Sequence, residues 1–401
     1  MNRIGDISNK KILLLQGPMG DFFKKLDLKF RSRGAVTFHV GLNAGDRFFS
    51  NGDNYIPFRG TVEEWEGYIG DFYDEKNIDM VFLFGDCRLY QSIAIGMARE
   101  REIDVFVFEL GYVRPDYVTM ERYGVNDYSL ISRDASFYRS LPCVGYPKPL
   151  PAYPSRFKML YSATLYYLVA NLFASRYPHY RHHRDFSAAR EFFFGVRGAI
   201  RKVIYPLRES RYMKKVTGAL SKKYYLVPLQ THNDFQVLQH SNYISIEKFI
   251  IEVLESFANN APKDRWLIFK HHPVDRGRKN YRSFIMRQAE LYEIEDRVLV
   301  VHDLYLPILL QKAIGVVTIN STVGLTAIGY GIPTITLGGA IYDIEGLTNR
   351  ELSIDRFWRD YTPPSKELYL KFVNYLIDKT QLNGSFYGRF PIELDEDEMY
   401  R

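Results

Sequence analysis

The stretch AIGVVTINSTVGLTAIGYGIPTITLGG, residues 313–339, decides the fold class. GVVTIN is a short uncharged run rich in β-branched residues, TVGLTAIGYG fits a short helix, and IPTITLGG is a second apolar run. Runs of this kind are typical of parallel strands that are covered on both faces. The stretch therefore predicts a strand, a helix and a second parallel strand, which is the repeating unit of an α/β fold.

The same alternation of apolar runs with amphipathic stretches extends outward in both directions. The other strand candidates are KILLLQ (11–16), AVTFHV (35–40), MVFLFG (80–85), VFVFEL (105–110), KKYYLVPLQ (222–230), RWLIFKHHP (265–273) and RVLVVHD (297–303). Five prolines in residues 141–157 can continue neither a helix nor a strand, so they divide the series into two halves. We therefore predict an α/β protein of GT-B type, in which two Rossmann-like domains face a central cleft.

The expected domain limits follow from these breaks. The segments are a first Rossmann-like domain at 1–145, a linker with an aromatic and basic helical part at 146–221, a second Rossmann-like domain at 222–380 and an acidic tail at 381–401. A chain of 401 residues is too long for one hydrophobic core and suits two domains.

Composition indicates the compartment. The 2 cysteines, Cys87 and Cys143, fit a reducing compartment and make neither a disulfide framework nor a zinc site. No apolar run approaches the roughly 18 residues that span a bilayer. The first apolar run is followed by Gly-Pro and has no small-residue cleavage site, so we interpret it as a buried strand and expect a cytoplasmic protein.

Basic residues are concentrated in one segment. Residues 176–223 hold 13 Lys and Arg against 3 Asp and Glu, whereas the rest of the chain holds 40 against 44. This distribution argues against general nucleic-acid binding and for a local anionic partner. The aromatic stretch that precedes and overlaps the segment carries Tyr161, Tyr166, Tyr167, Phe173 and Tyr177. These rings can lie at the depth of lipid headgroups while the cations meet anionic lipid, or they can pack against the domains, and both can hold.

Two strand ends in the second half carry side chains that suit a phosphate. The strand WLIFK runs directly into His271 and His272, and an imidazole there can donate to a phosphate or steady a leaving nucleotide. GVVTIN ends in Asn320, Ser321 and Thr322 at the start of a helix, where hydroxyl groups and backbone N–H groups bind phosphate. A solvated turn and a simple helix cap are the alternatives without a ligand. Because both strand ends belong to one predicted sheet, we expect a nucleotide phosphate site.

Gln230 and Asp234, in LVPLQTHNDFQ (226–236), are expected beside the same edge, although an ordinary polar loop also explains them. No complete G-x-G-x-x-G or Walker sequence is present. The only DED lies at 395–397 in the acidic tail, and His182 and His183 have no carboxylates at metal-ligand spacing. We therefore expect a site that works without a metal and without a resident cofactor.

The first half offers a carboxylate at the end of a strand. In FVFELGYVRPDYVTMERYGVN (106–126), Glu109 closes a buried strand and Gly111 permits a tight turn, with Arg114 and Asp116 in the loop that follows. A carboxylate there can act as a nucleophile or general base, and a nearby arginine would keep it ionised. A loop ion pair is the alternative. Asp86 and Arg88 stand at the neighbouring strand end.

Six stretches together resemble one known family. They are LLLQGPMGDFF, FELGYVRPDYVT, YPHYRHHR, LVPLQTHNDFQ, FKHHPVDRG and INSTVGLTAIGYGIPTITLGGAIYDIEGLT, in that order along the chain. On this ground the chain resembles the capsule polysaccharide biosynthesis/export family, and within it the single-module KpsS type. The resemblance implies a β-Kdo transferase, which moves Kdo from CMP-β-Kdo to phosphatidylglycerol and so places the first sugar of the capsule lipid linker.

The resemblance also implies roles for particular residues. The His-Pro motif falls on His272 and Pro273, with Lys270 before it; with Gln230, Ser321 and Thr322 these would hold CMP, and the acidic loop falls on Glu109, Gly111 and Arg114. Related two-module enzymes carry Glu-Asp-Gly where this chain has Glu-Leu-Gly, so Glu109 is the first candidate for the nucleophile and Asp116 the second.

The expected partners are a CMP-sugar donor, an anionic phospholipid acceptor, the inner face of the inner membrane and a capsule assembly or export complex. Two alternatives are another sugar-nucleotide enzyme of GT-B type, such as a UDP-sugar transferase or an epimerase, and a non-catalytic export or scaffold protein.

Overall fold

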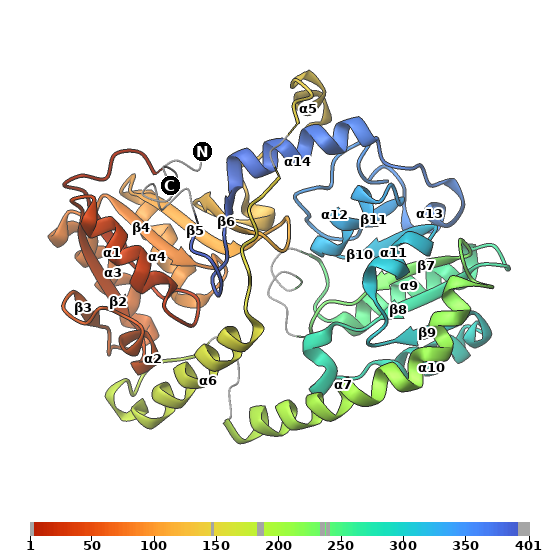
Figure 1. Ribbon diagram of the computed structural model, residues 1–401, viewed down its shortest axis with the longest axis horizontal. Coiled ribbons are helices and arrows are strands. Elements are labelled where there is room, and N and C mark those ends of the chain that lie inside the picture. The colour runs from red at the N-terminus through yellow and green to blue at the C-terminus, as the bar shows by residue number, and fades with distance from the viewer. Residues whose placement is uncertain (1–3, 146–147, 183–187, 233–236, 238–240, 392–401) are drawn as a thin grey trace. The chain divides into compact units, whose positions relative to one another are not determined.

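The computed structural model describes all residues except 1–3, 146–147, 183–187, 233–236, 238–240 and 392–401. The chain forms two compact units, each built around one β-sheet (Figure 1). The first unit comprises residues 1–130, 145–185 and 374–401, and the second unit comprises residues 131–144 and 186–373. The chain therefore enters the second unit twice and returns to the first unit at its end.

The sheet of the first unit has the strand order β12-β6-β5-β4-β1-β2-β3. Its strands are β1 (Lys11–Leu14), β2 (Val36–Gly41), β3 (Tyr55–Pro57), β4 (Met80–Phe84), β5 (Asp104–Leu110), β6 (Tyr117–Arg122) and β12 (Gln381–Asn383). The strands β1 to β5 are parallel, whereas β6 pairs with β5, and β12 with β6, in the antiparallel direction. The carboxyl ends of the parallel strands thus lie along one edge, where parallel sheets bind ligands.

Helices cover both faces of this sheet. The helices of this unit are α1 (Phe22–Ser32), α2 (Ala44–Phe48), α3 (Val62–Lys76), α4 (Leu89–Glu100) and α6 (Arg156–Leu172), which packs against α2, with the 3₁₀ turns η1 (Asn126–Tyr128) and η2 (Ala174–Arg176). Because successive side chains of a strand point to opposite faces, β4 divides its residues between two cores. Val81 and Leu83 belong to the core that holds Trp65 of α3, whereas Phe82 packs on Phe30 of α1 with ring centres 4.8 Å apart.

The sheet of the second unit is parallel throughout, with the strand order β11-β10-β7-β8-β9. Its strands are β7 (Tyr224–Pro228), β8 (Trp266–Lys270), β9 (Val298–Val301), β10 (Gly315–Thr318) and β11 (Thr334–Thr336). The helices are α5 (Ala135–Ser140), α7 (Ala188–Thr217), α9 (Ile246–Asn260), α10 (Arg282–Leu291), α11 (Leu306–Lys312), α12 (Thr322–Gly329), α13 (Ile354–Asp360) and the first part of α14 (Lys366–Thr380), with the turns η3 (Pro273–Gly277) and η4 (Glu295–Arg297). From residue 374 onward α14 belongs to the first unit. This strand order makes the carboxyl ends of β10, β7 and β8 neighbours.

Every strand predicted from the sequence is present, and the predicted α/β class with two Rossmann-like domains is confirmed. The sequence did not predict β3, β6 and β12, which lie at the two edges of the first sheet. The strand β12 lies in the segment 381–401, which was expected to be an acidic tail, and α7 lies in the expected linker 146–221 but belongs to the second unit. Burial explains the difference at β12, because Leu382 is 2% exposed within a short and otherwise polar strand.

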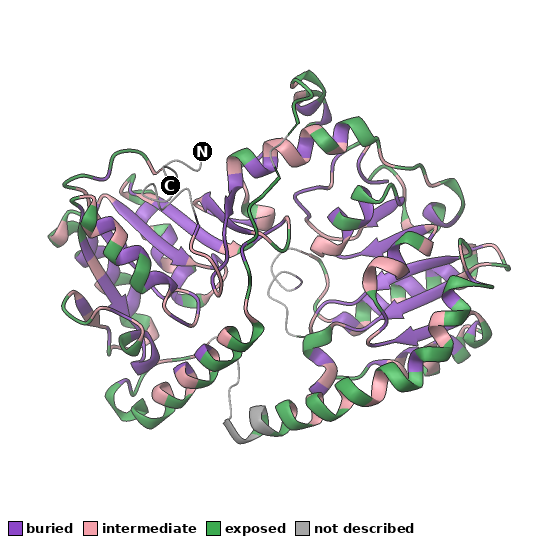
Figure 2. Cartoon of the chain, viewed as in Figure 1, coloured by how far each residue is buried: buried purple, intermediate pink, exposed green. Residues whose placement is uncertain are grey.

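Figure 2 shows that the strands of both sheets are buried, whereas α6 and α7 each keep a large exposed face. The exposed faces carry large apolar side chains, including Leu160 on α6 and Leu207 on α7, which are 66% and 74% exposed. Within the described ranges, no helix combines the length and the apolar character that crossing a bilayer requires.

Replacing Leu382 with alanine tests the place of β12 in the first unit. Leu382 belongs to the same core as Phe108 and Val118. Removing the methyl groups of a buried leucine costs about 2–5 kcal/mol, so we expect a lower unfolding midpoint in urea than for the wild type. The control is Leu28→Ala on α1, because Leu28 is 52% exposed; its loss should stay within about 0.5 kcal/mol. A Leu382→Ala variant as stable as the wild type would contradict a core role for β12.

Candidate functional site

A pair of amide side chains joins the carboxyl ends of β7 and β10. Gln230 follows β7, and its Nε2 atom donates a hydrogen bond to Oδ1 of Asn320 at 2.9 Å. The backbone N–H of Asn320, which follows β10, donates in return to Oε1 of Gln230 at 3.3 Å. Gln230 is buried and Asn320 is half-buried. The structure thus brings together two residues that the sequence predicted for the same edge.

Ser321 caps α12 directly after Asn320. Its Oγ accepts a hydrogen bond from the backbone N–H of Val323 at 3.3 Å, and the hydroxyl of Tyr342 donates to its carbonyl oxygen. Ser321 and Thr322 are half-buried, so the first turn of α12 is partly open to solvent. The partial positive charge of a helix N-terminus favours an anion at this position. The hydroxyl cap that the sequence predicted is present, and its geometry suits a phosphate oxygen.

His272 begins the turn after β8. It is the N-cap residue of η3, and its Nδ1 atom accepts a hydrogen bond from the backbone N–H of Val274 at 3.2 Å. A neutral imidazole that accepts through Nδ1 carries its proton on Nε2 and can donate that proton to an oxygen. His272 is half-buried, and the following Pro273 is exposed. Proline at the start of η3 needs no partner for a backbone N–H and fixes the direction of the turn.

A buried carboxylate connects the loops that follow β7 and β8. Asp275 is 1% exposed; its Oδ1 lies 2.7 Å from Nδ1 of His232, and its Oδ2 accepts the backbone N–H of His232 at 3.0 Å. With the pair of Gln230 and Asn320, this contact cross-links three adjacent strand ends. No role for His232 or Asp275 was predicted from the sequence. Asp234 lies outside the described residues.

Lys270 and His271 turn their side chains into the second unit. The Nζ atom of Lys270 donates to the carbonyl oxygen of His302 at 3.2 Å, and burial lowers the pKa of this ammonium group. His271 accepts the backbone N–H of Tyr281 through Nε2 at 3.1 Å and stacks on the ring of His302 at 4.4 Å. Burial, helped by neighbouring positive charge, lowers the pKa of His271 to about 3. Both residues were predicted to contact the nucleotide, but their contacts in the structure support the turn that carries His272.

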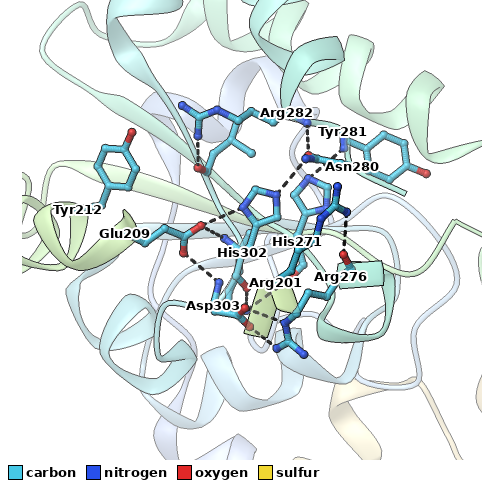
Figure 3. Close-up of polar contacts among 12 residues, drawn as sticks. Arg201, Glu209, Tyr212, His271, Arg276, Asn280, Tyr281, Arg282, His302 and Asp303 are labelled. Atoms are coloured by element: carbon cyan, nitrogen blue, oxygen red, sulfur yellow. Dashed lines mark hydrogen bonds and ion pairs between the residues drawn. The ribbon is translucent and has the colours of Figure 1, made fainter. Parts of the chain in front are cut away.

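Glu209 of α7 holds the residues that follow β9 (Figure 3). Its Oε1 accepts the backbone N–H of His302 at 2.8 Å and lies 2.9 Å from Nδ1 of that ring, and its Oε2 accepts the backbone N–H of Asp303 at 3.0 Å. The other ring nitrogen of His302 lies 3.2 Å from Oδ1 of Asn280, and Arg276 donates to Asp303 at 2.7 Å. This cluster was not predicted from the sequence. The run RVLVVHD places His302 and Asp303 directly after a strand, so the criterion applied to β8 would have found them.

In the first unit, Glu109 is a half-buried carboxylate near the end of β5. Its Oε1 accepts the backbone N–H of Leu110 at 2.8 Å. Burial raises the pKa of Glu109, while the hydrogen bond from Leu110 and the charges of Arg88 and Arg114 act in the opposite direction. A nucleophile or general base needs this combination of partial access and nearby cations.

The loop after β5 is built around Gly111. A Cβ atom at this position would lie 2.1 Å from the carbonyl oxygen of Tyr117, so the close approach of the two backbone segments requires glycine. The Nε atom of Arg114 donates to the carbonyl oxygen of Gly111 at 3.0 Å, and the Arg114–Pro115 peptide bond is cis. Arg114 is exposed, which leaves its guanidinium at the surface of the first unit close to Glu109 in sequence.

Asp116, the second candidate for the nucleophile, has a structural contact. Its Oδ1 accepts the backbone N–H of Ala152 at 2.8 Å, and its carbonyl oxygen accepts the backbone N–H of Gly384 at 3.0 Å and Nδ2 of Asn383 at 2.7 Å. These contacts fasten three separate segments of the first unit to one another. The geometry therefore favours Glu109 over Asp116.

Asp86 and Arg88 follow β4, the neighbour of β5. Asp86 is buried, and its Oδ2 accepts the backbone N–H of Val125 at 2.8 Å. The guanidinium carbon of Arg88 lies 4.9 Å from the ring centre of Phe84, and its charge opposes the rise in the pKa of Glu109. Arg88 thus has an electrostatic effect on Glu109, and Asp86 supports the loop.

The aromatic stretch divides its rings between the interior and the surface. Tyr166 and Tyr177 are buried in the first unit, and Tyr167 is half-buried. Tyr161 and Phe173 are 59% and 41% exposed. Packing, one of the two interpretations of the sequence, therefore holds for Tyr166 and Tyr177, and contact with lipid stays a prediction for Tyr161 and Phe173.

Side chains that could bind a metal are scattered in the part of the chain that the structure describes. No group of three or more His, Cys, Asp or Glu side chains there could hold a metal ion. The ring of His182 packs edge-on against Tyr167 at 5.7 Å. His183 and the DED at 395–397 lie outside the described residues.

These features define a protein of two Rossmann-like units with polar side chains at the strand ends of each. The capsule polysaccharide biosynthesis protein family matches residues 79–387. The chain is 39% identical over 381 residues to the capsule polysaccharide export protein KpsS of Escherichia coli, covering 95% of this chain and 98% of that protein. It therefore belongs to the capsule polysaccharide biosynthesis protein family, which confirms the resemblance found in the sequence.

Two further similarities are more distant. The chain is 36% identical over 389 residues to the capsule polysaccharide modification protein LipB of Neisseria meningitidis serogroup A, covering 95% of this chain and 93% of that protein. The solved structure of KpsC from Thermosulfurimonas dismutans, a β-Kdo 2,7 transferase, aligns with 97% of this chain and 100% of that chain at 15% identity, with a TM-score of 0.45.

Replacing His271 with phenylalanine should reduce the pH dependence of stability. The pKa of His271 is about 3 in the folded protein, against an ordinary value of about 6.5. Between these values the unfolded chain binds a proton at this position and the folded chain does not, so stability falls as the pH drops from about 6.5 toward 3. Phenylalanine keeps a ring in the stack but cannot titrate. The slope of the unfolding free energy against pH should therefore decrease by up to about 1.4 kcal/mol per pH unit.

The measurement is urea unfolding at a series of pH values within that window. The control is His179→Phe, because His179 is exposed and its replacement should leave the slope unchanged. A His271→Phe variant with the slope of the wild type would contradict a neutral, buried His271.

Proposed function

We propose that this chain is a glycosyltransferase that moves Kdo from CMP-β-Kdo to phosphatidylglycerol and so begins the lipid linker of a capsule polysaccharide. Membership of the capsule family supports capsule synthesis as the setting, and the resemblance to the KpsS type supports the donor and the acceptor. The observation that carries the proposal is the cross-linked polar edge over β10, β7 and β8. This edge combines a hydroxyl-capped helix N-terminus with a histidine of fixed orientation.

The second unit would hold the CMP moiety. In the proposed mechanism the phosphate lies at the first turn of α12, where Ser321 and Thr322 offer hydroxyl groups and the helix offers a positive end. The Nε2–H of His272 donates to the phosphate and stabilises the charge that develops as CMP leaves. Gln230 and Asn320 hold the loops of this edge in register through their mutual hydrogen bonds. No metal is required by this scheme, since the helix end and the imidazole supply the stabilising dipoles.

The first unit would supply the nucleophile for a reaction that retains configuration. The carboxylate of Glu109 attacks the anomeric carbon of Kdo, the bond from that carbon to the phosphate oxygen breaks, and CMP leaves with the electron pair. The oxygen of the acceptor hydroxyl then attacks the same carbon, the bond to Glu109 breaks with its electron pair on the carboxylate, and the hydroxyl proton is released to solvent; two inversions give net retention. The guanidinium of Arg114 pairs with the carboxylate of the sugar, a contact that can be bidentate.

The acceptor sets the place of the reaction. Phosphatidylglycerol lies in a bilayer, so the enzyme would work as a peripheral protein on the inner face of the inner membrane, beside the proteins that assemble and export the capsule. The family membership supports this setting, and a nucleic-acid partner has no part in it.

Substitutions of Glu109 and His272 test the proposed chemistry. We expect Glu109→Gln and His272→Ala each to lower kcat by at least about 100-fold, because they remove the nucleophile and a donor to the leaving phosphate. The assay is transfer from CMP-Kdo to a fluorescent phosphatidylglycerol analogue. Asp116→Asn is the matched control, since asparagine keeps an oxygen that accepts from Ala152. Transfer at the wild-type rate by either variant would remove that residue from the mechanism, and loss of transfer only in Asp116→Asn would make Asp116 the nucleophile.

Thermal shifts with nucleotides test the donor separately. We expect CMP to raise the Tm of the wild type more than UDP does, because a ligand that binds only the folded state stabilises it in proportion to its affinity. Ser321→Ala should reduce the shift with CMP, while Ser385→Ala in the first unit should not. A larger shift with UDP would favour another sugar-nucleotide enzyme. Donor and acceptor that release no CMP on mixing would favour a non-catalytic export or scaffold protein.

A further inference from the structure

The second unit contains a pocket of about 630 Å³ between α7 and the segments that follow β8 and β9. Its floor includes His302, on which the ring of Tyr205 stacks at a centroid distance of 4.1 Å. Pockets of this size accept small molecules and lipid headgroups. Ser321 and Gln230 do not line the pocket. They belong to the polar edge over β10, β7 and β8 where the donor is proposed to bind, which we call the donor edge. The pocket is therefore a separate feature of the unit.

The pocket is strongly cationic. The arginines that line it are Arg197, Arg201, Arg208, Arg211 and Arg282, and its one acidic residue is Glu209. The carboxylate of Glu209 is occupied by the residues after β9. In the described part of the chain no carboxylate lies within ion-pair distance of the five guanidinium groups. Arg197 and Arg201, for example, donate to carbonyl oxygens in and just after η3, and Arg282 donates to the carbonyl oxygen of a strand residue.

Tyr212 lies beside two of these arginines, Arg211 and Arg282. A guanidinium nitrogen of Arg211 donates to the Tyr212 hydroxyl at 3.1 Å. Burial alone would raise the pKa of this phenol, but the hydrogen bonds and charges of Arg211 and Arg282 outweigh it and lower the pKa below the ordinary value. The potential at this wall of the pocket therefore favours a negative charge.

The outer face of α7 is apolar and continuous with the pocket. It presents Phe193, Val196, Ile200, Val203 and Leu207, which are 58%, 44%, 55%, 66% and 74% exposed. Their spacing of three and four residues places them on one side of the helix, and the first three also line the pocket. We call these five residues the α7 stripe. Helices that lie in a membrane interface combine such a stripe with flanking arginines and lysines.

Charge decides which partner fits this face. A second copy of the chain would bring a second set of uncompensated arginines against the first, which is repulsive. A bilayer with anionic lipids offers a hydrocarbon layer for the α7 stripe and phosphate groups for the guanidiniums, which bind phosphate in a bidentate manner.

We propose that the α7 pocket binds the phosphate headgroup of an anionic phospholipid while the α7 stripe enters the outer part of the bilayer, so that α7 is a docking helix. The bound lipid serves as an anchor and is distinct from the acceptor that reacts. This docking does not depend on the proposed reaction, because it uses neither Glu109 nor the donor edge.

Vesicle binding tests the proposal. The full-length protein is sedimented with vesicles of phosphatidylcholine alone or of phosphatidylcholine mixed with phosphatidylserine. Phosphatidylserine offers an anionic headgroup without the glycerol hydroxyls of the proposed acceptor, and no CMP-sugar is present. We expect the wild type to prefer the mixed vesicles and to lose affinity as salt is added. Equal binding to both kinds of vesicle, or no binding to either, would overturn the proposal.

Paired variants locate the surface. Arg208→Glu/Arg211→Glu should lower the partition coefficient on mixed vesicles by at least about 30-fold, corresponding to about 1 kcal/mol per arginine near an anionic surface. Val203→Ser/Leu207→Ser should lower binding to both kinds of vesicle. The matched control is Arg287→Glu/Leu291→Ser on α10, which makes the same kinds of change at two exposed positions of the same unit. If the control variant loses as much vesicle binding as the α7 variants, the general charge of the protein and not α7 governs binding, and the proposal is wrong.

Two further measurements separate the other occupants. The thermal shift with CMP should be the same in Arg208→Glu/Arg211→Glu and in the wild type; loss of that shift with normal vesicle binding would make the pocket a nucleotide site and overturn the lipid assignment. Light scattering should show the same mass for Val203→Ser/Leu207→Ser and the wild type without lipid, whereas a dimer abolished by this variant would assign the stripe to self-association. Transfer is also measured in detergent micelles, where docking is not needed. Variants that lose vesicle binding but still transfer in micelles are defective in docking alone, whereas absence of transfer by the wild type would count against the proposed function.

Discussion

The hydrogen bonds of the Glu209 carboxylate support two features of the second unit, the polar edge over β10, β7 and β8 and the pocket along α7. The carboxylate accepts two consecutive backbone N–H groups after β9 and faces a ring nitrogen of His302, all inside the unit. A buried N–H group without a partner costs about 1–3 kcal/mol, so rotation or sliding of α7 that moved Glu209 away would be opposed by several such losses. The rotation of α7 about its own axis is thereby fixed. That rotation decides which side chains of α7 face the pocket and which face outward.

The same contact reaches the donor edge through two stacked rings. His302, oriented by Glu209, stacks on His271, and His271 accepts a backbone N–H ahead of α10. These contacts hold the end of β8 to the interior of the unit, directly before the turn that begins at His272. Stabilisation of a leaving phosphate depends on donors that are in place before charge develops, because reorientation during the reaction would consume the gain. A neutral His271 serves this purpose, since a buried charge would weaken the stack.

Local residue patterns in the sequence predicted the strands and the polar residues at their ends. Contacts between residues that lie far apart in the chain were not predicted. The strands, and the polar residues that end them, follow from apolar runs that stop at Gln230, His272 and Asn320. The alternation of side chains along a strand ends with β8 at Lys270, so it could not show that His271 is buried and His272 half-buried. The role of Glu209 was beyond such patterns, because it sits in a basic helix far from β9 in sequence. The strand β12 was missed for a different reason, because three residues are too few to show the alternation of a strand.

The packing of α7 bears on why residues 176–223 hold so many basic side chains. Arg197 and Arg201 attach α7 to η3 by donating to carbonyl oxygens, a contact that uses their hydrogen atoms and leaves their charge uncompensated. The helix approaches η3 closely there, because a Cβ atom at Gly277 would lie 2.0 Å from the carbonyl oxygen of Phe194. Neutral donors would satisfy the same carbonyl groups, so packing does not account for the positive charge. The proposed anionic phospholipid would account for it, because its phosphate would meet the arginines and its acyl chains would meet the apolar stripe beside them.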